Sequence, residues 1–462
     1  MTAMKQEVID DFKSKLRGRV FQPDDAGYEE ARQIWNAMIE RRPAMIARCA
    51  GSADVMACVA FARDHEVSLA VRGGGHNIAG NALCDGGLVI DLSGMRSVRI
   101  DPDRRRAYVA GGATLADFDH EAQAFGLATP LGINSTTGVA GLTLGGGFGW
   151  LSRAHGLSVD NLMAADIVIA DGRQIHINAS EQPDLFWAIR GGGGNFGVVT
   201  TFEFQLHPVG PQVTAGLIVF PFAQARQVLT RYRDFVGGIG DDLSVWGVLR
   251  KAPPLPFLPV DVHGKEVVVL ALFSPLPQER VMPAIDALRG FGQACGEHIG
   301  PMPYAAWQQA FDPLLAPGAR NYWKSHNFTA LSDEAIDTTI GYVAKLPTPQ
   351  CEIFLGLLGG RVNRVAPDAM AYPHRNVLYA MNVHTRWDDP SEDDLCVAWA
   401  RDFFAAVAPY AAGSVYINFL TEDEGARIPE AYGQNYERLA RTKAKFDPRN
   451  LFRQNQNIRP VA

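Results

Sequence analysis

Residues 71–80, VRGGGHNIAG, place four glycines around a single histidine, His76, with an asparagine directly after it. Glycine has no Cβ and tolerates positive φ, so a loop of this composition lets the backbone come very close to a bound group. The histidine adds one titratable, nucleophilic side chain at the same place. The stretch therefore predicts a loop that wraps a ligand and presents His76 to it.

Two more glycine clusters follow within the next 130 residues: GINSTTGVAGLTLGGGFG at 132–149 and GGGGNFG at 191–197. A single cluster of this kind is consistent with a tight turn. Three clusters in one predicted domain favour a long ligand that lies along several loops, because consecutive backbone N–H groups can bind a diphosphate.

The two commonest phosphate-binding motifs do not explain these glycines. Gly192, Gly194 and Gly197 satisfy G-x-G-x-x-G, but that motif needs a strand before it and a helix after it. Here DLFWAIR precedes the glycines and the β-branched run VVTTFEFQL follows them. No cluster ends in Gly-Lys-Ser or Gly-Lys-Thr, and the eleven histidines form no H-x-x-x-H or H-x-H pair with carboxylate support. We therefore expect neither a Rossmann motif, nor a Walker loop, nor a metal site.

Composition narrows the class of protein. The 462 residues exceed one ordinary core, so two domains are expected, and 47% hydrophobic with 20% charged residues is typical of a globular enzyme. A net charge of −7 argues against a nucleic-acid partner. The charged amino terminus lacks an export signal, and no run approaches the ~18 apolar residues of a membrane span. The six cysteines show no metal spacing, so we expect reduced, mostly buried thiols and a cytoplasmic protein.

The pattern along the chain is mixed α and β. We expect a helix at 52–65 capped by Ser52, short strands at 68–73, 87–93, 97–101 and 106–112, and a capped helix from Thr114 to Gly126. After about residue 210 the glycine runs give way to Pro-rich loops and aromatic strands, which indicates a domain boundary. The last fifty residues hold a strand, VYINF, and a charged helix, GQNYERLARTKAKF.

Long ordered motifs resemble one family. VRGGGHN, GVAGLTLGGGFGWLSRAHGLSVDNL, DLFWAIRGGGGNFGVVT and the terminal YINF with YGQNYERLARTKAKFDPRNLF are similar to the FAD-linked oxidases of the vanillyl-alcohol oxidase superfamily. The nearest branch is the berberine-bridge-enzyme-like group, with bacterial members such as 6-hydroxy-D-nicotine oxidase. The resemblance runs from about residue 20 to the end.

The resemblance implies an α+β fold with two domains. Residues 1–210, completed by 413–462, would form the PCMH-type FAD-binding domain of two α/β subdomains. Residues 211–412 would form a substrate domain with a large antiparallel sheet flanked by helices.

The same resemblance assigns the cofactor site. The ring of His76 would be bonded to the 8α-methyl group of FAD, and residues Arg72, Gly73, Gly74, Gly75 and Asn77 would wrap the diphosphate. The remaining cofactor contacts that the resemblance implies are Thr136, Thr137, Gly138, Gly141 and Leu142 at the phosphate and ring, Val198 at the adenine or ribose, and Asn418 at the isoalloxazine.

One departure from the family concerns the second flavin bond. Many relatives attach a cysteine from a G-x-C-P segment, but here Asn134 stands at the cysteine position and Ser135 at the proline position. We expect a single histidyl link and no cysteinyl link, and Cys84 lies across a different turn.

The implied reaction is hydride transfer from a C–H of an alcohol or amine of a small metabolite to flavin N5, with reoxidation by dioxygen to give hydrogen peroxide. A dehydrogenase with another electron acceptor and a non-catalytic flavin carrier remain open. The candidate bases are Tyr416, expected on the same face of a strand as Asn418, and Tyr372 and Tyr322 of the substrate domain. An aromatic surface for a planar or glycosidic substrate is expected from Trp307, Tyr322, Trp323, His384 and Trp387. Substrate and oligomeric state are not encoded in any recognisable pattern.

Overall fold

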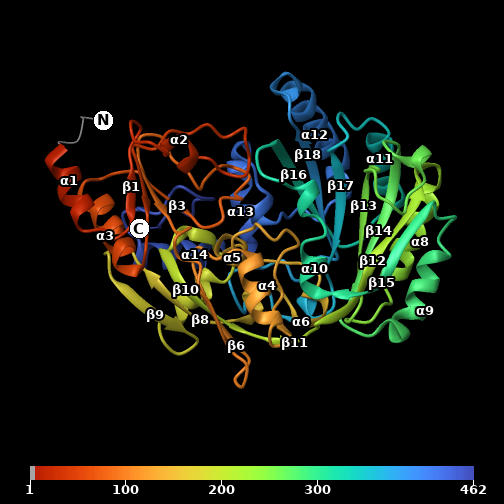
Figure 1. Cartoon of the computed structure of the whole chain (residues 1–462), viewed down its shortest axis with the longest axis horizontal. Coiled ribbons are helices and arrows are strands. Elements are labelled where there is room, and N and C mark those ends of the chain that lie inside the picture. Colours follow the sequence, from red (N-terminus) through yellow and green to blue (C-terminus); the bar gives the residue numbers. More distant parts are fainter. Residues whose placement is uncertain (1–5, 462) are drawn as a thin grey trace.

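The computed structural model describes residues 6–461, and its β structure is divided between two halves of the chain. Figure 1 shows the amino-terminal half, in red to yellow, beside a large sheet in green to blue. Strands of the first half lie between residues 19 and 205, and those of the large sheet between 212 and 387. This division follows the change in composition near residue 210.

A four-stranded sheet positions the first glycine loop. Its order is β1-β2-β4-β3, with β2, β4 and β3 parallel and β1 antiparallel to β2. The strands are β1 (Arg19–Phe21), β2 (Met45–Arg48), β3 (Leu69–Arg72) and β4 (Leu88–Asp91). Helix α3 (Ser52–Asp64) packs its apolar face, including Val55 and Val59, onto this sheet. The predicted helix is confirmed, but its predicted cap is wrong because Gly51 is the N-cap residue and Ser52 is already helical.

A five-stranded antiparallel sheet carries the third glycine loop at the start of one of its strands. Its strands, in sheet order, are β5 (Val98–Asp101), β6 (Arg106–Ala110), β10 (Val198–Gln205), β8 (Leu162–Val168) and β9 (Gln174–Asn178). Helix α7 (Pro183–Ile189) comes before the glycines and β10 after them. Since a dinucleotide fingerprint needs the reverse order, its exclusion is confirmed.

The large sheet has seven antiparallel strands. In sheet order they are β15 (Gly296–Pro303), β12 (Gln212–Pro221), β14 (Glu266–Ser274), β13 (Ser244–Lys251), β17 (Glu352–Leu357), β18 (Tyr379–Trp387) and β16 (Arg320–Phe328). Helices cover one face: α8 (Ala225–Val236) and α9 (Gln278–Arg289) at the outer right of Figure 1, and α11 (Asp333–Val343) and α12 (Asp393–Val407) above. The antiparallel sheet flanked by helices that we expected is confirmed.

The remaining elements are short. Strands β7 (Leu127–Ala128) and β11 (His207–Pro208) pair with each other. The other helices are α1 (Gln6–Ser14), α2 (Tyr28–Ala31), α4 (Leu115–Gln123), α5 (Val139–Leu144), α6 (Ser152–His155), α8 (Ala225–Val236), α9 (Gln278–Arg289), α10 (Tyr304–Gln308), α11 (Asp333–Val343), α12 (Asp393–Val407), α13 (Ile428–Tyr432) and α14 (Tyr436–Phe446). Thr114 and Asp117 form a capping box at α4, so the predicted start of that helix is confirmed.

The carboxyl-terminal residues return to the first half of the chain. Helix α14 packs against α7, and the buried Lys443 donates to the carbonyl of Asn195 beside the third glycine loop. The strand expected at 415–419 is wrong, because Ile417–Phe419 form a single 3-10 turn closed by the bond from the Phe419 N–H to the Tyr416 carbonyl. This stretch passes the edge of the large sheet without joining it.

All six cysteines are free, and all except the half-buried Cys295 are buried, as expected. Across residues 6–461 no helix combines the length and the apolar character needed to cross a membrane.

Candidate active site

A cavity of about 370 Å³ lies where the three glycine loops meet the large sheet. Its wall includes residues of each glycine loop, side chains of β13, β17, β18 and β16, and two carboxyl-terminal stretches, 416–419 and 454–456. Of the residues expected at the cofactor, the wall contains Gly73, Gly74, Gly75, His76, Asn77, Thr137, Gly138, Gly141, Leu142, Val198 and Asn418. Segments far apart in the sequence are therefore brought to one site.

The first two glycine loops touch backbone to backbone. A Cβ added at Gly74 would lie 2.3 Å from the Gly138 nitrogen, and one added at Gly138 would lie 2.4 Å from the Gly74 nitrogen. No rotamer change relieves such a contact, because both atoms belong to the main chain. Glycine is needed here so that the two loops can close on each other.

The loops leave backbone donors and open space on the cavity side. Within residues 6–461, none of the N–H groups of residues 73–77 donates to a backbone carbonyl. A Cβ added at Gly141 or Gly194 would have no atom within 4 Å. Unused N–H groups beside open space suit the phosphate oxygens of a dinucleotide such as FAD.

His76 stands in this wall as a neutral imidazole. Its Nε2 lies 2.9 Å from the Thr136 hydroxyl oxygen, and its ring stacks on Trp35 at a centroid distance of 5.2 Å. Burial lowers the pKa of His76 to about 4. At neutral pH one ring nitrogen therefore keeps its lone pair.

Asn134 and Ser135 stand at the positions of the second attachment motif. Their hydrogen bonds stabilise the loop. The Asn134 side-chain oxygen accepts from the Thr136 N–H at 3.0 Å and from the Thr136 hydroxyl at 2.7 Å. The Ser135 N–H donates to Asp312 at 2.9 Å. Asn134 thereby orients the hydroxyl that contacts His76, although Thr136 itself lies outside the cavity wall.

Tyr416 and Asn418 meet at the cavity despite the absence of a strand. The Asn418 amide donates to the Tyr416 hydroxyl oxygen at 2.9 Å and to the Leu142 carbonyl at 3.1 Å. The Gly147 N–H also donates to the Tyr416 oxygen, at 2.9 Å. A Cβ at Gly145 would lie 2.2 Å from the Asn418 side-chain oxygen, so glycine makes room for it.

The hydroxyl of Tyr416 receives two hydrogen bonds in a buried setting. Burial raises the pKa of Tyr416 to about 12, whereas the Gly147 N–H and the Asn418 amide act in the opposite direction because both stabilise the phenolate. Phe148 and Phe419 pack edge-on against its ring, each at 4.9 Å between centroids.

Three other expected site residues lie elsewhere. The Arg72 guanidinium is outside the cavity wall and pairs with Asp91 at 2.7 Å, which holds β3 to β4. Tyr372 packs behind the wall, 6.4 Å from the Tyr416 ring. The Tyr322 hydroxyl donates to Asp423 at 2.7 Å on the helix-covered face of the large sheet. Burial raises the pKa of both of these tyrosines.

The large sheet contributes a row of four side chains to the cavity. Arg250, Glu352, His384 and Trp323 occupy opposite positions on β13, β17, β18 and β16, and all four line the wall. Arg250 donates to Glu352 at 2.6 Å, and His384 Nδ1 lies 3.4 Å from the same carboxylate. The Trp323 ring meets the His384 ring edge-on at 4.7 Å. We call these four residues the cross-strand row.

The charges of the row compensate one another. Burial alone would raise the pKa of Glu352, but the Arg250 guanidinium and His384 hold it below its ordinary value. Burial lowers the pKa of His384 in spite of the neighbouring carboxylate. The row therefore offers one ion pair, one neutral imidazole and one indole to a ligand.

Three residues of the wall were not expected from the sequence: Arg250, Glu352 and Trp35. A charged residue inside an apolar run, as in the CEIFLGL of β17, is the signal that marks Glu352. His384 and Trp323 were expected as part of an aromatic surface and lie in the wall, whereas Trp307 and Trp387 do not. No group of three or more potential metal ligands occurs in the described part of the chain.

Comparison with protein families matches two parts of the chain. Residues 43–178 match the FAD binding domain family, and residues 415–459 match the family described as berberine and berberine like.

Two relatives are similar over almost their whole length. An FAD-linked oxidoreductase of Dictyostelium discoideum is 31% identical over 462 residues, with 98% of this chain and 97% of the relative covered. The (R)-6-hydroxynicotine oxidase of Paenarthrobacter nicotinovorans is 31% identical over 457 residues, with 96% and 97% covered.

Two solved structures are similar to this chain over almost its whole length. The crystal structure of 6-hydroxy-D-nicotine oxidase from Arthrobacter nicotinovorans has a TM-score of 0.86 at 29% identity, covering 96% of this chain and 98% of that one. Xylooligosaccharide oxidase from Myceliophthora thermophila C1, in complex with xylobiose, has a TM-score of 0.85 at 26% identity, covering 98% and 99%.

Proposed function

The chain belongs to the FAD-linked oxidoreductases with a berberine-like carboxyl-terminal segment, and on that basis we propose that it is an oxidase whose FAD is bonded to His76 alone. Bound FAD would supply a two-electron acceptor for a hydride from a C–H of an alcohol or amine of a small metabolite, with dioxygen as final acceptor and hydrogen peroxide as product. The observation that carries the proposal is a neutral, half-buried imidazole in a wall of unused backbone donors.

The hydrogen bonds around His76 favour attachment through Nδ1. The Thr136 hydroxyl donates to Asn134, so it can only accept from His76, which leaves the proton on Nε2. The Nδ1 lone pair is then the available nucleophile, and its hydrogen bond with the Thr137 hydroxyl is long, at 3.5 Å. The absence of a cysteine at position 134 supports a single link.

Tyr416 is the best placed of the three tyrosines to accept the substrate proton. It is the one that lines the cavity, and its oxygen already receives two donors that would stabilise a phenolate. Tyr322 is bonded to Asp423 on the other face of the sheet. A base must reach the proton that it removes, so geometry favours Tyr416 over Tyr322 and Tyr372.

The cross-strand row would orient the substrate. Trp323 and His384 present ring surfaces, and the Arg250–Glu352 pair presents hydrogen-bonding groups without net charge. This combination suits a small molecule with a planar or ring-shaped body and a hydroxyl or amino group, because rings stack on aromatic side chains and the polar groups need partners.

The test begins with the purified protein and His76→Ala. We expect yellow protein whose colour stays with the polypeptide after acid precipitation, and a His76→Ala variant whose flavin is released by acid. A panel of alcohols and amines, read anaerobically at the flavin absorbance, then identifies the substrate class. Colourless wild-type protein, or flavin freed by acid from the wild type, contradicts the proposal.

The electron acceptor is tested separately. Mixing the substrate-reduced protein with air-saturated buffer in a stopped-flow instrument should restore the oxidised spectrum and yield one hydrogen peroxide per flavin. Very slow reoxidation in air, with fast reoxidation by an artificial acceptor, identifies the chain as a dehydrogenase instead. Flavin that no substrate of the panel reduces supports a carrier.

A further inference from the structure

We propose that Lys324 is a positioning residue that holds residues 416–424, here called the crossing segment, against the cavity. The inference rests on the proposed function in one respect, the assignment of Tyr416 as the base. It adds a residue that touches neither substrate nor cofactor and that acts through the placement of Tyr416.

The crossing segment passes over the outer edge of the large sheet. Strand β16 is the edge strand, and its successive side chains point to opposite faces. On the cavity face Trp323 packs edge-on against Phe419, with ring centroids 5.5 Å apart. On the helix-covered face the next residue, Lys324, binds Asp423 of the same segment. Two adjacent residues of β16 therefore contact the crossing segment, one on each face of the sheet.

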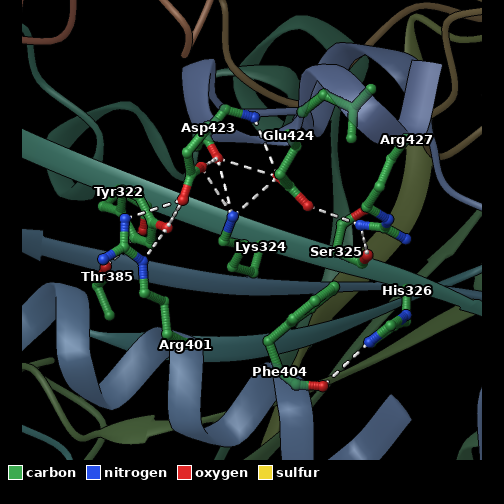
Figure 2. Close-up of polar contacts among 12 residues, drawn as sticks. Tyr322, Lys324, Ser325, His326, Thr385, Arg401, Phe404, Asp423, Glu424 and Arg427 are labelled. Carbon is green, nitrogen blue, oxygen red and sulfur yellow. Dashed lines mark hydrogen bonds and ion pairs between the residues drawn. The ribbon is translucent and has the colours of Figure 1, made fainter.

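Lys324 is the central cation in the polar contacts between β16 and the crossing segment. Its Nζ lies 2.8 Å from Asp423 Oδ1, 3.4 Å from Glu424 Oε2 and 3.3 Å from the Thr421 hydroxyl (Figure 2). The Lys324 side chain is 6% exposed and that of Glu424 is 4% exposed. A buried ammonium between the buried Glu424 and the partly exposed Asp423 relieves the repulsion between the two carboxylates.

Two arginines also bind these carboxylates, one each. Arg401 binds Asp423 at 2.9 Å, but its side chain is 56% exposed. Arg427 is 15% exposed and, of the two carboxylates, binds Glu424, at 2.7 Å. Figure 2 shows Arg401 reaching in from α12 and Arg427 from the far side, with Lys324 between the two acidic residues. Of the three cations, Lys324 is therefore the one that joins both carboxylates to the sheet.

Short-range bonds connect the carboxylates to Tyr416. The Thr421 N–H and hydroxyl both donate to Glu424, at 3.1 and 2.9 Å, and the Leu420 N–H donates to the Ile417 carbonyl. Displacement of Glu424 would thus be transmitted along the segment to the Tyr416 hydroxyl at Gly147. Misplacement of a catalytic group by about 1 Å can reduce a rate about 100-fold.

The experiment compares Lys324→Met with Arg401→Met in the flavin-loaded protein. Both variants remove one cation from Asp423, but only the first removes the buried one. For Lys324→Met we expect faster amide hydrogen exchange confined to residues 414–427. We also expect the rate constant of flavin reduction at saturating substrate to fall by about 10- to 100-fold with little change in substrate Kd. Arg401→Met should change neither quantity.

Two further variants separate positioning from general stability. Lys324→Arg keeps the charge and should retain most of the activity. In a Tyr416→Phe background, Lys324→Met should add less than about twofold to the loss of rate, because the two residues act through one group. If Lys324→Met does not fold, Asp423→Asn, which leaves Lys324 paired with Glu424, takes its place in every comparison.

Three outcomes overturn the inference: unchanged exchange in residues 414–427, loss of protection spread evenly over the large sheet, or fully additive effects of Lys324→Met and Tyr416→Phe. If no compound reduces the flavin, the proposed function fails, while hydrogen exchange still decides whether Lys324 holds the crossing segment.

Discussion

The two walls of the cavity differ in the atoms that they present to a ligand. On one side, the contacts come from the main chain of glycine loops, in which Gly74 and Gly138 approach each other more closely than any side chain would allow. On the other side, four side chains from four strands form the cross-strand row. The glycine wall offers main-chain atoms, which suit the proposed cofactor, whereas the side-chain wall can be specific for one substrate.

Replacing Tyr416, which lies beside the side-chain wall, should remove the proposed base. We expect Tyr416→Phe to lower the rate constant of flavin reduction by about 10²- to 10⁴-fold, the usual contribution of a general base. Anaerobic stopped-flow absorbance measures this, and flavin content should not change. Tyr372→Phe, at a tyrosine behind the wall, is the matched control and should keep the wild-type rate. Equal losses in both variants would mean that the Tyr416 hydroxyl is not the base.

Removing the carboxylate of the row should destabilise the protein. Glu352→Ala leaves the buried Arg250 without its partner, a change that typically costs about 3–5 kcal/mol. Denaturant unfolding measures the loss. A double variant, Glu352→Leu with Arg250→Met, should recover much of it because no unpaired charge remains. A double variant less stable than Glu352→Ala would show that the ion pair itself stabilises the fold, beyond avoiding an unpaired buried charge.

The same pair predicts a pH dependence. The folded-state pKa of Glu352 lies below its ordinary value of about 4.3, so the ionised carboxylate stabilises the fold above that pH. This contribution is lost as the pH falls further. The difference in unfolding free energy between wild type and Glu352→Ala should therefore be constant from pH 6 to 8 and shrink below about pH 4.3. A difference that grows on acidification would contradict the assignment.

On the glycine wall, one added methyl group should lower both the stability and the flavin content of the protein. We expect Gly74→Ala to cost about 1–3 kcal/mol, the usual range for overpacking, and to reduce the flavin-to-protein ratio. Gly341→Ala on the exposed side of α11, where an added Cβ has no atom within 4 Å, serves as the control. It should stabilise the protein by up to about 1 kcal/mol. Normal flavin content in Gly74→Ala would show that the loops can separate without losing the cofactor.

The smallest effect is expected at Cys84. Burial raises the pKa of this thiol to about 11, and its sulfur lies outside the cavity wall. A protonated thiol is a poor nucleophile, so Cys84→Ser should retain all of the acid-stable flavin of the wild type. Mass analysis of the flavin-bearing peptide provides the measurement. Wild-type flavin found joined to the peptide of Cys84 as well as to that of His76 would show a second attachment.

The difference between the walls also explains what could be predicted from the sequence. The glycine loops are contiguous motifs, so residues 72–77 and 136–142 could be predicted to surround one ligand, and of these only Arg72 and Thr136 among the named contacts lie outside the cavity wall. The fold class followed from the same motifs. The structure then brought these loops to one cavity.

The residues that escaped prediction depend on pairing between distant strands. Arg250 and Glu352 are about 100 positions apart, and their proximity follows from the β13–β17 register, which no local pattern encodes. The strand expected at Tyr416 was wrong because apolar alternation cannot reveal that a segment crosses a sheet edge instead of joining it. Arg72 was expected at the diphosphate from the family resemblance, but its guanidinium binds Asp91, which lies opposite it on the neighbouring strand.

The register of the cross-strand row has a consequence for divergence among relatives. Each of its four members projects from a backbone whose ladder bonds are made whatever side chain it carries, so one exchange per strand alters the chamber without shifting the sheet. A few such exchanges could therefore change which substrate the chamber accepts without altering the glycine loops on the opposite side.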